Sequence, residues 1–88
     1  MKLILCPICQ DVRKLQTKGL TTCECGASYG QYLSDHYNAE IGGKAIPLGF
    51  LNSTLVEAIK NQPDSGLGYK FTAFVIPKEC DSINNLTK

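Results

Sequence analysis

The chain has 88 residues, a length that predicts one compact unit with a modest apolar core. Its 43% hydrophobic and 19% charged residues are typical of a globular protein and exclude an intrinsically disordered one. A formal net charge of +1 lacks the basic excess that usually accompanies binding to a nucleic-acid backbone. The sequence has no apolar run of about 18 residues, so we expect no membrane-spanning helix.

The expected compartment bears on how the cysteines are used. The opening MKLILC is too short for a secretory signal peptide, so we expect a cytoplasmic protein. Disulfides are rare in the cytoplasm. Five cysteines is an odd number, which suits a four-ligand metal site with one spare thiol better than a disulfide framework.

The first predicted element is a short apolar strand at residues 2–5, which leads into a close pair of cysteines. An irregular or strand-like finger over residues 11–20 separates this pair from a second one. The four residues follow the pattern Cys-x₂-Cys-x₁₃-Cys-x-Cys and are Cys6, Cys9, Cys23 and Cys25. Two tight pairs separated by a finger suit tetrahedral Zn²⁺, so we predict a zinc ribbon over residues 1–30 with one structural Zn²⁺.

Two details depart from the usual zinc knuckle. Gln10 follows the first pair, where glycine is common, and the second pair has one intervening residue rather than two. Gly26 does follow the second pair and allows the backbone to turn beneath a metal. Cys80 is expected to be a spare thiol. Either Cys80 or His36 could replace a ligand in this set.

The sequence CPIC at residues 6–9 also has the Cys-Pro-x-Cys form of glutaredoxin-like thiol oxidoreductases. Such a site needs an apolar strand before the pair and a well-formed helix after it, whereas residues 11–20 supply at most two helical turns. The second pair has no role in that arrangement. Unliganded cysteines in a reduced core are a third interpretation, which the turn-like setting of both pairs disfavours.

The middle of the chain gives mixed signals. Residues 29–37 fit either a strand or a helix, because aromatic residues at helical spacing compete with β-prone content and Gly30. Beyond them, Gly42-Gly43 lies between two extended segments and predicts a β-hairpin, with Pro47 at an edge position.

The clearest helix follows at residues 52–62, and Pro63 ends it. Ser53 or Thr54 can cap its first turn, the latter in a capping box with Glu57. An apolar stripe lies along one side and comprises Leu55, Val56 and Ile59.

The last third begins with a glycine-rich loop at residues 61–68. Residues 69–77 predict a strand with apolar side chains on both faces, which favours a central, covered position. Residues 81–88 are polar and predict a flexible tail. Residues 31–80 would form a subdomain of hairpin, helix and strand. The predicted fold class is α+β, with the zinc ribbon packed on a small antiparallel sheet and one helix.

Catalytic motifs are missing from the sequence. Neither HExxH nor a phosphate-binding loop occurs, and four cysteine ligands close a zinc ion to substrate. We therefore expect a non-catalytic, zinc-stabilised binding or adaptor protein with a protein partner. One alternative is a binder of nucleic acid or a nucleotide-like small molecule, through tyrosine stacking and the helix N-terminus. A glutaredoxin-like oxidoreductase is the second alternative. The candidate contact residues are Tyr32, Asn52, Ser53, Asn61, Gln62 and Asp64.

Four stretches, CPIC…TCECG, AIPLGF, NQPDSGLG and FTAFVIPKEC, together resemble a group of short bacterial and phage-type proteins of uncharacterised function that begin with a zinc ribbon. The resemblance runs over most of the chain. It implies a prokaryotic, cytosolic, metal-containing small protein, and it is compatible with a regulator that a phage or bacterium directs at a host system. The four cysteines are the only residues onto which it carries a role.

Overall fold

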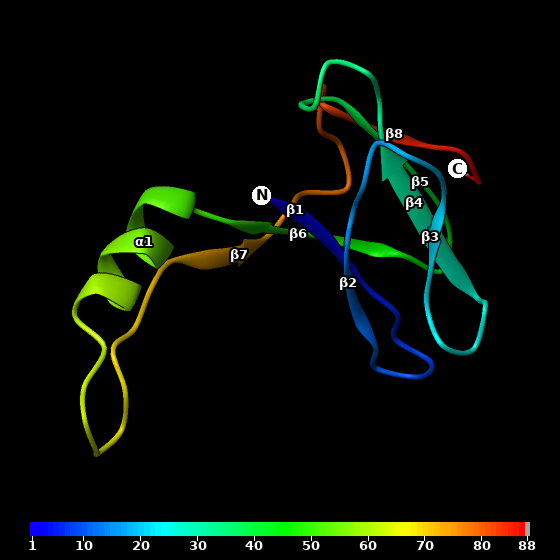
Figure 1. The fold of residues 1–88 in the computed structure, drawn as a ribbon. Coiled ribbons are helices and arrows are strands. Elements are labelled where there is room, and N and C mark those ends of the chain that lie inside the picture. Colours follow the sequence, from blue (N-terminus) through cyan, green and yellow to red (C-terminus); the bar gives the residue numbers. More distant parts are fainter. Residues whose placement is uncertain (88) are drawn as a thin grey trace.

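The computed structural model describes residues 1–87 and shows an α+β fold with eight strands in two sheets and one helix (Figure 1). The predicted fold class is therefore confirmed. Lys88, the last residue of the predicted tail, lies outside the described residues. The helix in residues 1–87 is too short and too weakly apolar to cross a membrane.

The first sheet has the strand order β2-β1-β6-β7 and is antiparallel throughout. Its central strands are β1 (Lys2–Leu5) and β6 (Ile46–Phe50), and β2 (Val12–Lys14) and β7 (Ala73–Val75) are its edges. The predicted strand at residues 2–5 and the strand-like finger are both confirmed.

The second sheet has the order β3-β4-β5-β8 and consists of β3 (Thr21–Thr22), β4 (Ser28–Tyr32), β5 (Ala39–Gly43) and β8 (Ile83–Asn85). β8 pairs with β5 in parallel, with Ala39 opposite Ile83. The first sheet is antiparallel as expected, whereas this one is mixed. Residues 83–85 of the predicted tail form a strand, because the half-buried Ile83 packs against the core.

The main core lies between the two sheets. Ile4 of β1 and Ile41 of β5 are almost completely buried and pack with Leu15 and Ala39. Tyr32, Ala45 and Ile83 pack around them. Because Ile4 and Ile41 belong to different sheets, burial of this cluster holds the two sheets together.

The ambiguous segment at residues 29–37 continues β4 to Tyr32 and then turns. In that turn the Asp35 carboxylate accepts the backbone N–H groups of Tyr37 and Asn38, both at 2.9 Å. A short acidic side chain that satisfies the backbone ahead of it favours a turn over a helix.

The hairpin predicted at Gly42-Gly43 was wrong. The segments on either side of it, β5 and β6, belong to different sheets and do not pair with each other. Gly43 has a φ of 66° and the Lys44 N–H donates to the Ala27 carbonyl at 2.8 Å. The glycine turn therefore carries the chain from one sheet to the other instead of folding it back on itself.

Helix α1 runs over Asn52–Lys60, which confirms the predicted helix but ends it two residues earlier, and its expected cap was wrong. The N-cap residue is Leu51, which makes no side-chain capping hydrogen bond. Thr54 instead donates its hydroxyl to the Leu51 carbonyl at 2.8 Å and accepts the Thr72 N–H at 2.9 Å. Thr54 thus ties the helix start to the chain that returns towards β7.

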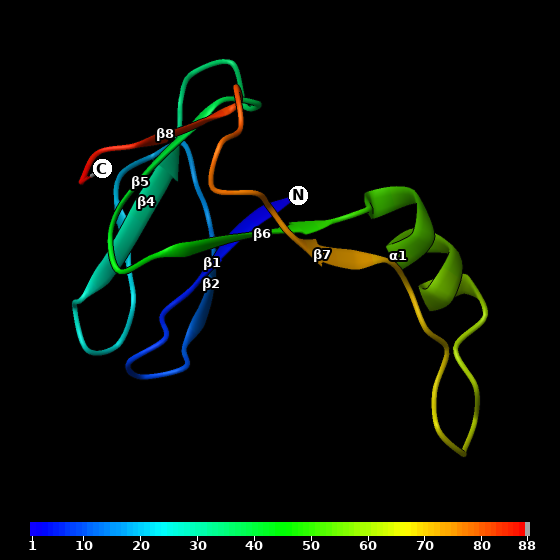
Figure 2. The same ribbon diagram turned by 180° about the vertical axis from the view of Figure 1, so that it is seen from behind.

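The prediction of a long central strand at residues 69–77 was wrong in the length of the strand and in its place in the sheet. Only Ala73–Val75 form β7, and this strand is an exposed edge rather than a covered centre. Together with α1 and the intervening loop it forms a projection, residues 51–75, which we call the arm. Figures 1 and 2 show that β7 runs beside β6 in the first sheet, whereas α1 and the loop extend away from both sheets. The radius of gyration is 14.2 Å, whereas a compact domain of this length has about 12 Å.

Candidate metal centre

Two neighbouring turns hold the four cysteines, which we call the metal centre (Figure 1). The β1–β2 turn carries Cys6 and Cys9, and the β3–β4 turn carries Cys23 and Cys25. Cys6 and Cys23 are buried, Cys9 is half-buried and Cys25 is exposed. The structure therefore brings both predicted pairs together at one end of the sheets.

The first turn is closed by backbone hydrogen bonds. The Gln10 N–H donates to the Cys6 carbonyl at 2.7 Å, and the Cys6 N–H donates to the Asp11 carbonyl at 2.9 Å. Gln10 has a φ of 59°, in the left-handed region that favours glycine. The unusual glutamine thus adopts the backbone conformation for which glycine is common at this position.

The second turn accommodates its short cysteine spacing in the same way. The Gly26 N–H donates to the Cys23 carbonyl at 3.1 Å, and the Cys23 N–H donates to the Ser28 carbonyl at 2.9 Å. Gly26 has a φ of 82°, which glycine adopts without steric cost. One residue between Cys23 and Cys25 is therefore enough to direct both thiols to the same point.

The four sulfur atoms have the spacing of a metal site. All four Sγ atoms lie within 4.8 Å of one another, and Cys25 Sγ lies 3.6 Å from both Cys6 Sγ and Cys23 Sγ. A tetrahedral ion with Zn–S bonds of about 2.3 Å places its ligands about 3.8 Å apart. Disulfide sulfurs lie about 2.05 Å apart, and all five cysteines are free thiols. The cluster is a group that can hold one metal ion, plausibly structural zinc.

A buried hydroxyl beside the cluster fits the bound state. Ser28 is completely buried, and its Oγ lies near Cys6 without a well-formed hydrogen bond to any group in residues 1–87. Interaction with this hydroxyl is the main reason why the pKa of Cys6 is lowered to about 6. The Ser28 N–H also donates to Cys23 Sγ at 3.3 Å. Thiolates that bind metals accept such hydrogen bonds, so Ser28 is placed to satisfy them.

Charge repulsion within the cluster indicates the need for a cation. The Ala27 N–H lowers the pKa of Cys25, but desolvation and the nearby thiols of Cys23, Cys9 and Cys6 outweigh it and raise the pKa to about 12. Four thiolates so close together cannot all ionise without a positive charge between them. A dication resolves this conflict, because coordination keeps every thiol deprotonated.

Asp11 joins the two turns. Its Oδ2 accepts the Arg13 Nε–H at 2.6 Å and the backbone N–H of Glu24 at 2.9 Å. Glu24 lies between the two cysteines of the second turn, so the carboxylate ties the first turn to the second. The hydrogen bond from Arg13 is the main reason that the pKa of Asp11 lies below its ordinary value. Sequence reasoning missed both Asp11 and Ser28, because neither belongs to the cysteine spacing.

The substitute ligands lie elsewhere. Cys80 Sγ is 3.4 Å from Ser82 Oγ and lines a separate cavity with Lys2, and His36 lines another cavity. Cys25 therefore completes the cluster. The helix that a glutaredoxin-like site requires after CPIC is also missing, since residues 12–14 form β2.

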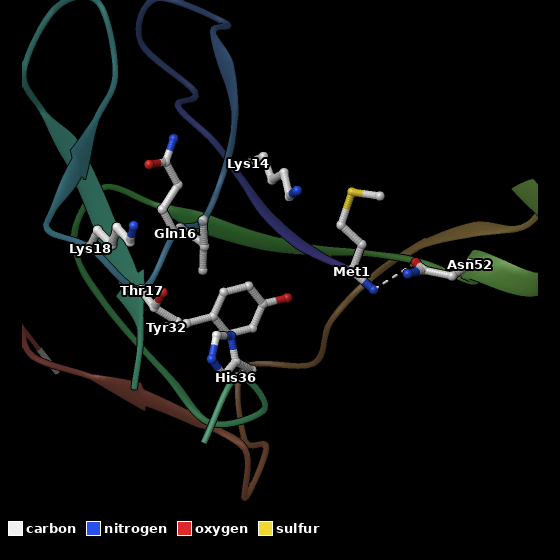
Figure 3. Close-up of a pocket in the computed structure, with 9 residues that line it drawn as sticks. Met1, Lys14, Gln16, Thr17, Lys18, Tyr32, His36 and Asn52 are labelled. Carbon is white, nitrogen blue, oxygen red and sulfur yellow. Dashed lines mark hydrogen bonds between the residues drawn. The ribbon is translucent and has the colours of Figure 1, made fainter. Parts of the chain in front are cut away.

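The six predicted contact residues are divided between two places. Tyr32 and Asn52 line one cavity (Figure 3). Ser53, Asn61, Gln62 and Asp64 are exposed on the arm. Asn61 donates from its amide to the Glu57 carbonyl at 2.9 Å and so caps the end of α1. Its role is therefore explained by the helix itself.

Comparisons with protein-family models, curated proteins and solved structures gave no significant match. The resemblance to short zinc-ribbon proteins thus gains no support beyond the four-cysteine cluster itself, which sits on β-hairpins as in a zinc ribbon.

Proposed function

We propose that this protein is a non-catalytic binding protein, stabilised by one Zn²⁺ on Cys6, Cys9, Cys23 and Cys25, that docks on a protein partner through its arm. The observation that carries the proposal is the concentration of exposed apolar side chains on the arm. Eight of the fourteen exposed large apolar residues in residues 1–87 lie there. They are Leu51, Val56, Ile59, Leu67, Tyr69, Phe71, Phe74 and Val75.

Helix α1 buries little of its surface against the rest of the chain. Ala58 is its only buried residue, whereas Val56 is 50% and Ile59 64% exposed. A helix of nine residues is marginal in water without tertiary packing. The apolar stripe predicted from the sequence exists, but most of it faces solvent. A partner that covers this stripe would supply the missing packing.

β7 offers a second point of attachment. It is an edge strand of three exposed residues, Ala73–Val75, with Phe74 packed over Gly49 of β6. Exposed apolar edge strands pair readily with extended segments of other chains. Such a partner segment would bind by continuing the first sheet.

Size and charge fit a protein interface. An aromatic side chain carries about 150–250 Å² of surface. Eight roughly half-exposed apolar residues therefore approach the ~800 Å² per partner of a standard interface. The arm carries Glu57 and Asp64 against Lys60 and Lys70, so two acids and two bases cancel. We therefore expect a partner segment that is apolar and weakly charged.

Site-specific photocrosslinking tests the proposal. A photoreactive residue replaces Ile59 on the arm or, as the control, Leu86, which is 50% exposed outside it. In the native host we expect one partner to crosslink from position 59 and not from position 86. The captured protein is then purified and its Kd measured against the unmodified chain.

Matched variants decide the outcome. Ile59→Glu should weaken binding of the purified partner at least about tenfold, since a buried charge costs more than 1.4 kcal/mol. Leu86→Glu should leave it unchanged. Equal crosslinking from both positions, or equal losses in both variants, would contradict the proposal. A crosslink to a second copy of this chain would replace the distinct partner with a homodimer.

A further inference from the structure

A basic cavity of about 450 Å³ lies where the finger, the second sheet and the start of α1 meet (Figure 3). Residues 14–18 form one wall, Tyr32 and His36 form another, and Met1 and Asn52 close the end. None of these residues belongs to the metal centre or to the exposed apolar set of the arm. A volume of about 300–1,000 Å³ is typical of small-molecule sites.

The side chains around the cavity carry one sign of charge. The charged side chains that line it are those of Lys14 and Lys18, and no Asp or Glu lines it. The structure gives neither lysine an acidic partner within residues 1–87. Arg13, next in sequence, is already engaged by Asp11. Asp35, beside His36, accepts hydrogen bonds from Tyr37 and Asn38 within its own turn. The cationic groups therefore remain available to an anion.

Neutral donors accompany these charges. The Tyr32 hydroxyl accepts the Lys2 N–H at 2.6 Å, which leaves its own hydrogen to donate. Asn52 accepts a hydrogen bond from the Met1 nitrogen at 2.9 Å through Oδ1, so its amide NH₂ remains a donor. Thr17 and Gln16 add a hydroxyl and a second amide. A ligand with several acceptor oxygens can meet several of these donors at once.

We propose that this cavity binds the phosphate group of a small phosphorylated molecule, with Lys14 and Lys18 as the principal contacts. A phosphate monoester is a near-dianion with three acceptor oxygens, which matches two lysines and several donors better than a single carboxylate does. The near-neutral chain favours a small molecule over a nucleic-acid strand, which needs a longer basic surface. Tyr32 and Asn52 belong to this site.

Titration of the zinc-loaded, ¹⁵N-labelled full chain tests the proposal by NMR. The probes are inorganic phosphate, ribose 5-phosphate, AMP and a single-stranded oligonucleotide. We expect saturable shifts of the amides of residues 14–18, Tyr32 and His36 with at least one of the first three probes, below about 10 mM. Inorganic phosphate binding as tightly as the esters would identify free phosphate as the source. Tighter binding of ribose 5-phosphate or AMP would identify a phosphorylated organic molecule.

Matched variants test the named contacts. Lys14→Gln/Lys18→Gln should weaken binding at least about tenfold, because charge-assisted hydrogen bonds are lost. Lys44→Gln/Lys70→Gln makes the same change in net charge outside the cavity and should alter the affinity less than twofold. The same spectra show whether each variant is folded.

Three results would overturn the inference. They are no saturable shift with any phosphate probe, equal effects of the two double variants, and preferential binding of the oligonucleotide with a steep salt dependence. Ile59→Glu on the arm should leave phosphate binding intact. Failure of partner binding and failure of this site are therefore separate observations.

Discussion

The metal centre and the arm differ in where their side chains point. The thiols of the metal centre point inward, towards one another, whereas the apolar side chains of the arm point outward, into solvent. At the metal centre four thiols point towards one another within 4.8 Å, and backbone hydrogen bonds close both turns around them. On the arm, Ile59 and Val75 are 64% and 66% exposed, and α1 buries only Ala58.

We infer from this contrast that the metal centre stabilises the fold and that the arm provides the binding surface. A small chain buries little apolar surface, so a metal staple can supply folding free energy that the core does not. The core between the sheets has four buried members in residues 1–87. The metal centre adjoins β1, which carries Ile4 of this core, and β4, whose Tyr32 packs against it. In the function that we propose, a metal ion fixes those turns, and the apolar arm stays free to bind a partner.

The largest effect is expected from Cys6→Ser. Cys6 is completely buried, and its loss removes one ligand and leaves a hydroxyl among thiols. We expect zinc binding to fail and both sheets to lose their ordered structure, because structural zinc sites contribute folding free energy outright. Native mass spectrometry and circular dichroism measure the two losses.

Cys80→Ser is the matched control for that prediction. Cys80 lies outside the cluster, so this variant should retain one zinc per chain and a native spectrum. A folded Cys6→Ser protein that still binds zinc tightly would show that the four-cysteine assignment is wrong.

Zinc affinity should rise with pH. At pH 7 the Cys6 thiol, with a pKa lowered to about 6, is mostly ionised, while Cys25, with a pKa raised to about 12, still carries its proton. Binding must expel that proton, so affinity increases about tenfold per pH unit for each proton released. Below the pKa of Cys6 the proton of this thiol must leave as well, and the dependence steepens. Competition with a chelator across this range measures it, and a flat profile would contradict the account.

Gly49→Ala should loosen the arm at its root. A Cβ at this position would come within 2.5 Å of the Phe74 ring, which must move away from β6. Overpacking of this kind costs about 1–3 kcal/mol. We expect β7 to detach while zinc binding persists, as measured by the amide shifts of residues 72–76. Loss of zinc in this variant would show that the two regions are coupled.

Gln10→Gly should give the smallest effect and a favourable one. Gln10 has a φ of 59°, and the left-handed conformation costs a residue other than glycine about 1–2 kcal/mol. The gain is partly offset by the larger entropy of glycine in the unfolded chain, so we expect at most about 1 kcal/mol of added stability. Denaturant unfolding of the zinc-loaded protein measures it. A clear destabilisation would indicate that the Gln10 side chain has a role of its own.

The metal centre could be predicted because its information is local. The cysteine spacing predicts two tight turns, and Gly26 supports the second of them. The conformation of such turns depends on few distant residues. Ser28 and Asp11 could not be found in the same way. Ser28 interacts with Cys6, and Asp11 accepts a hydrogen bond from Glu24. Each contact joins one turn to the other, so it forms only after the strands have paired.

The sheets could be predicted only in part, because strand pairing is non-local. Gly42-Gly43 correctly indicated a turn, but whether β5 and β6 pair depends on the partners already taken by β1 and β4. Residues 69–77 were expected to be covered, since apolar side chains on both faces usually indicate burial. On the arm the same pattern stays exposed at Val75 and Phe74. An apolar pattern does not distinguish burial within the chain from burial against another molecule.

Hydrogen–deuterium exchange of the isolated chain, with zinc and after its removal by a chelator, tests the central contrast most directly. With zinc we expect strong protection of β1, β4 and β5 and rapid exchange throughout α1. After zinc removal the strands should exchange rapidly too, while α1 changes little. Strands that stay protected without zinc, or an α1 as protected as β1 in the isolated chain, would contradict a metal-held body with an arm left free for a partner.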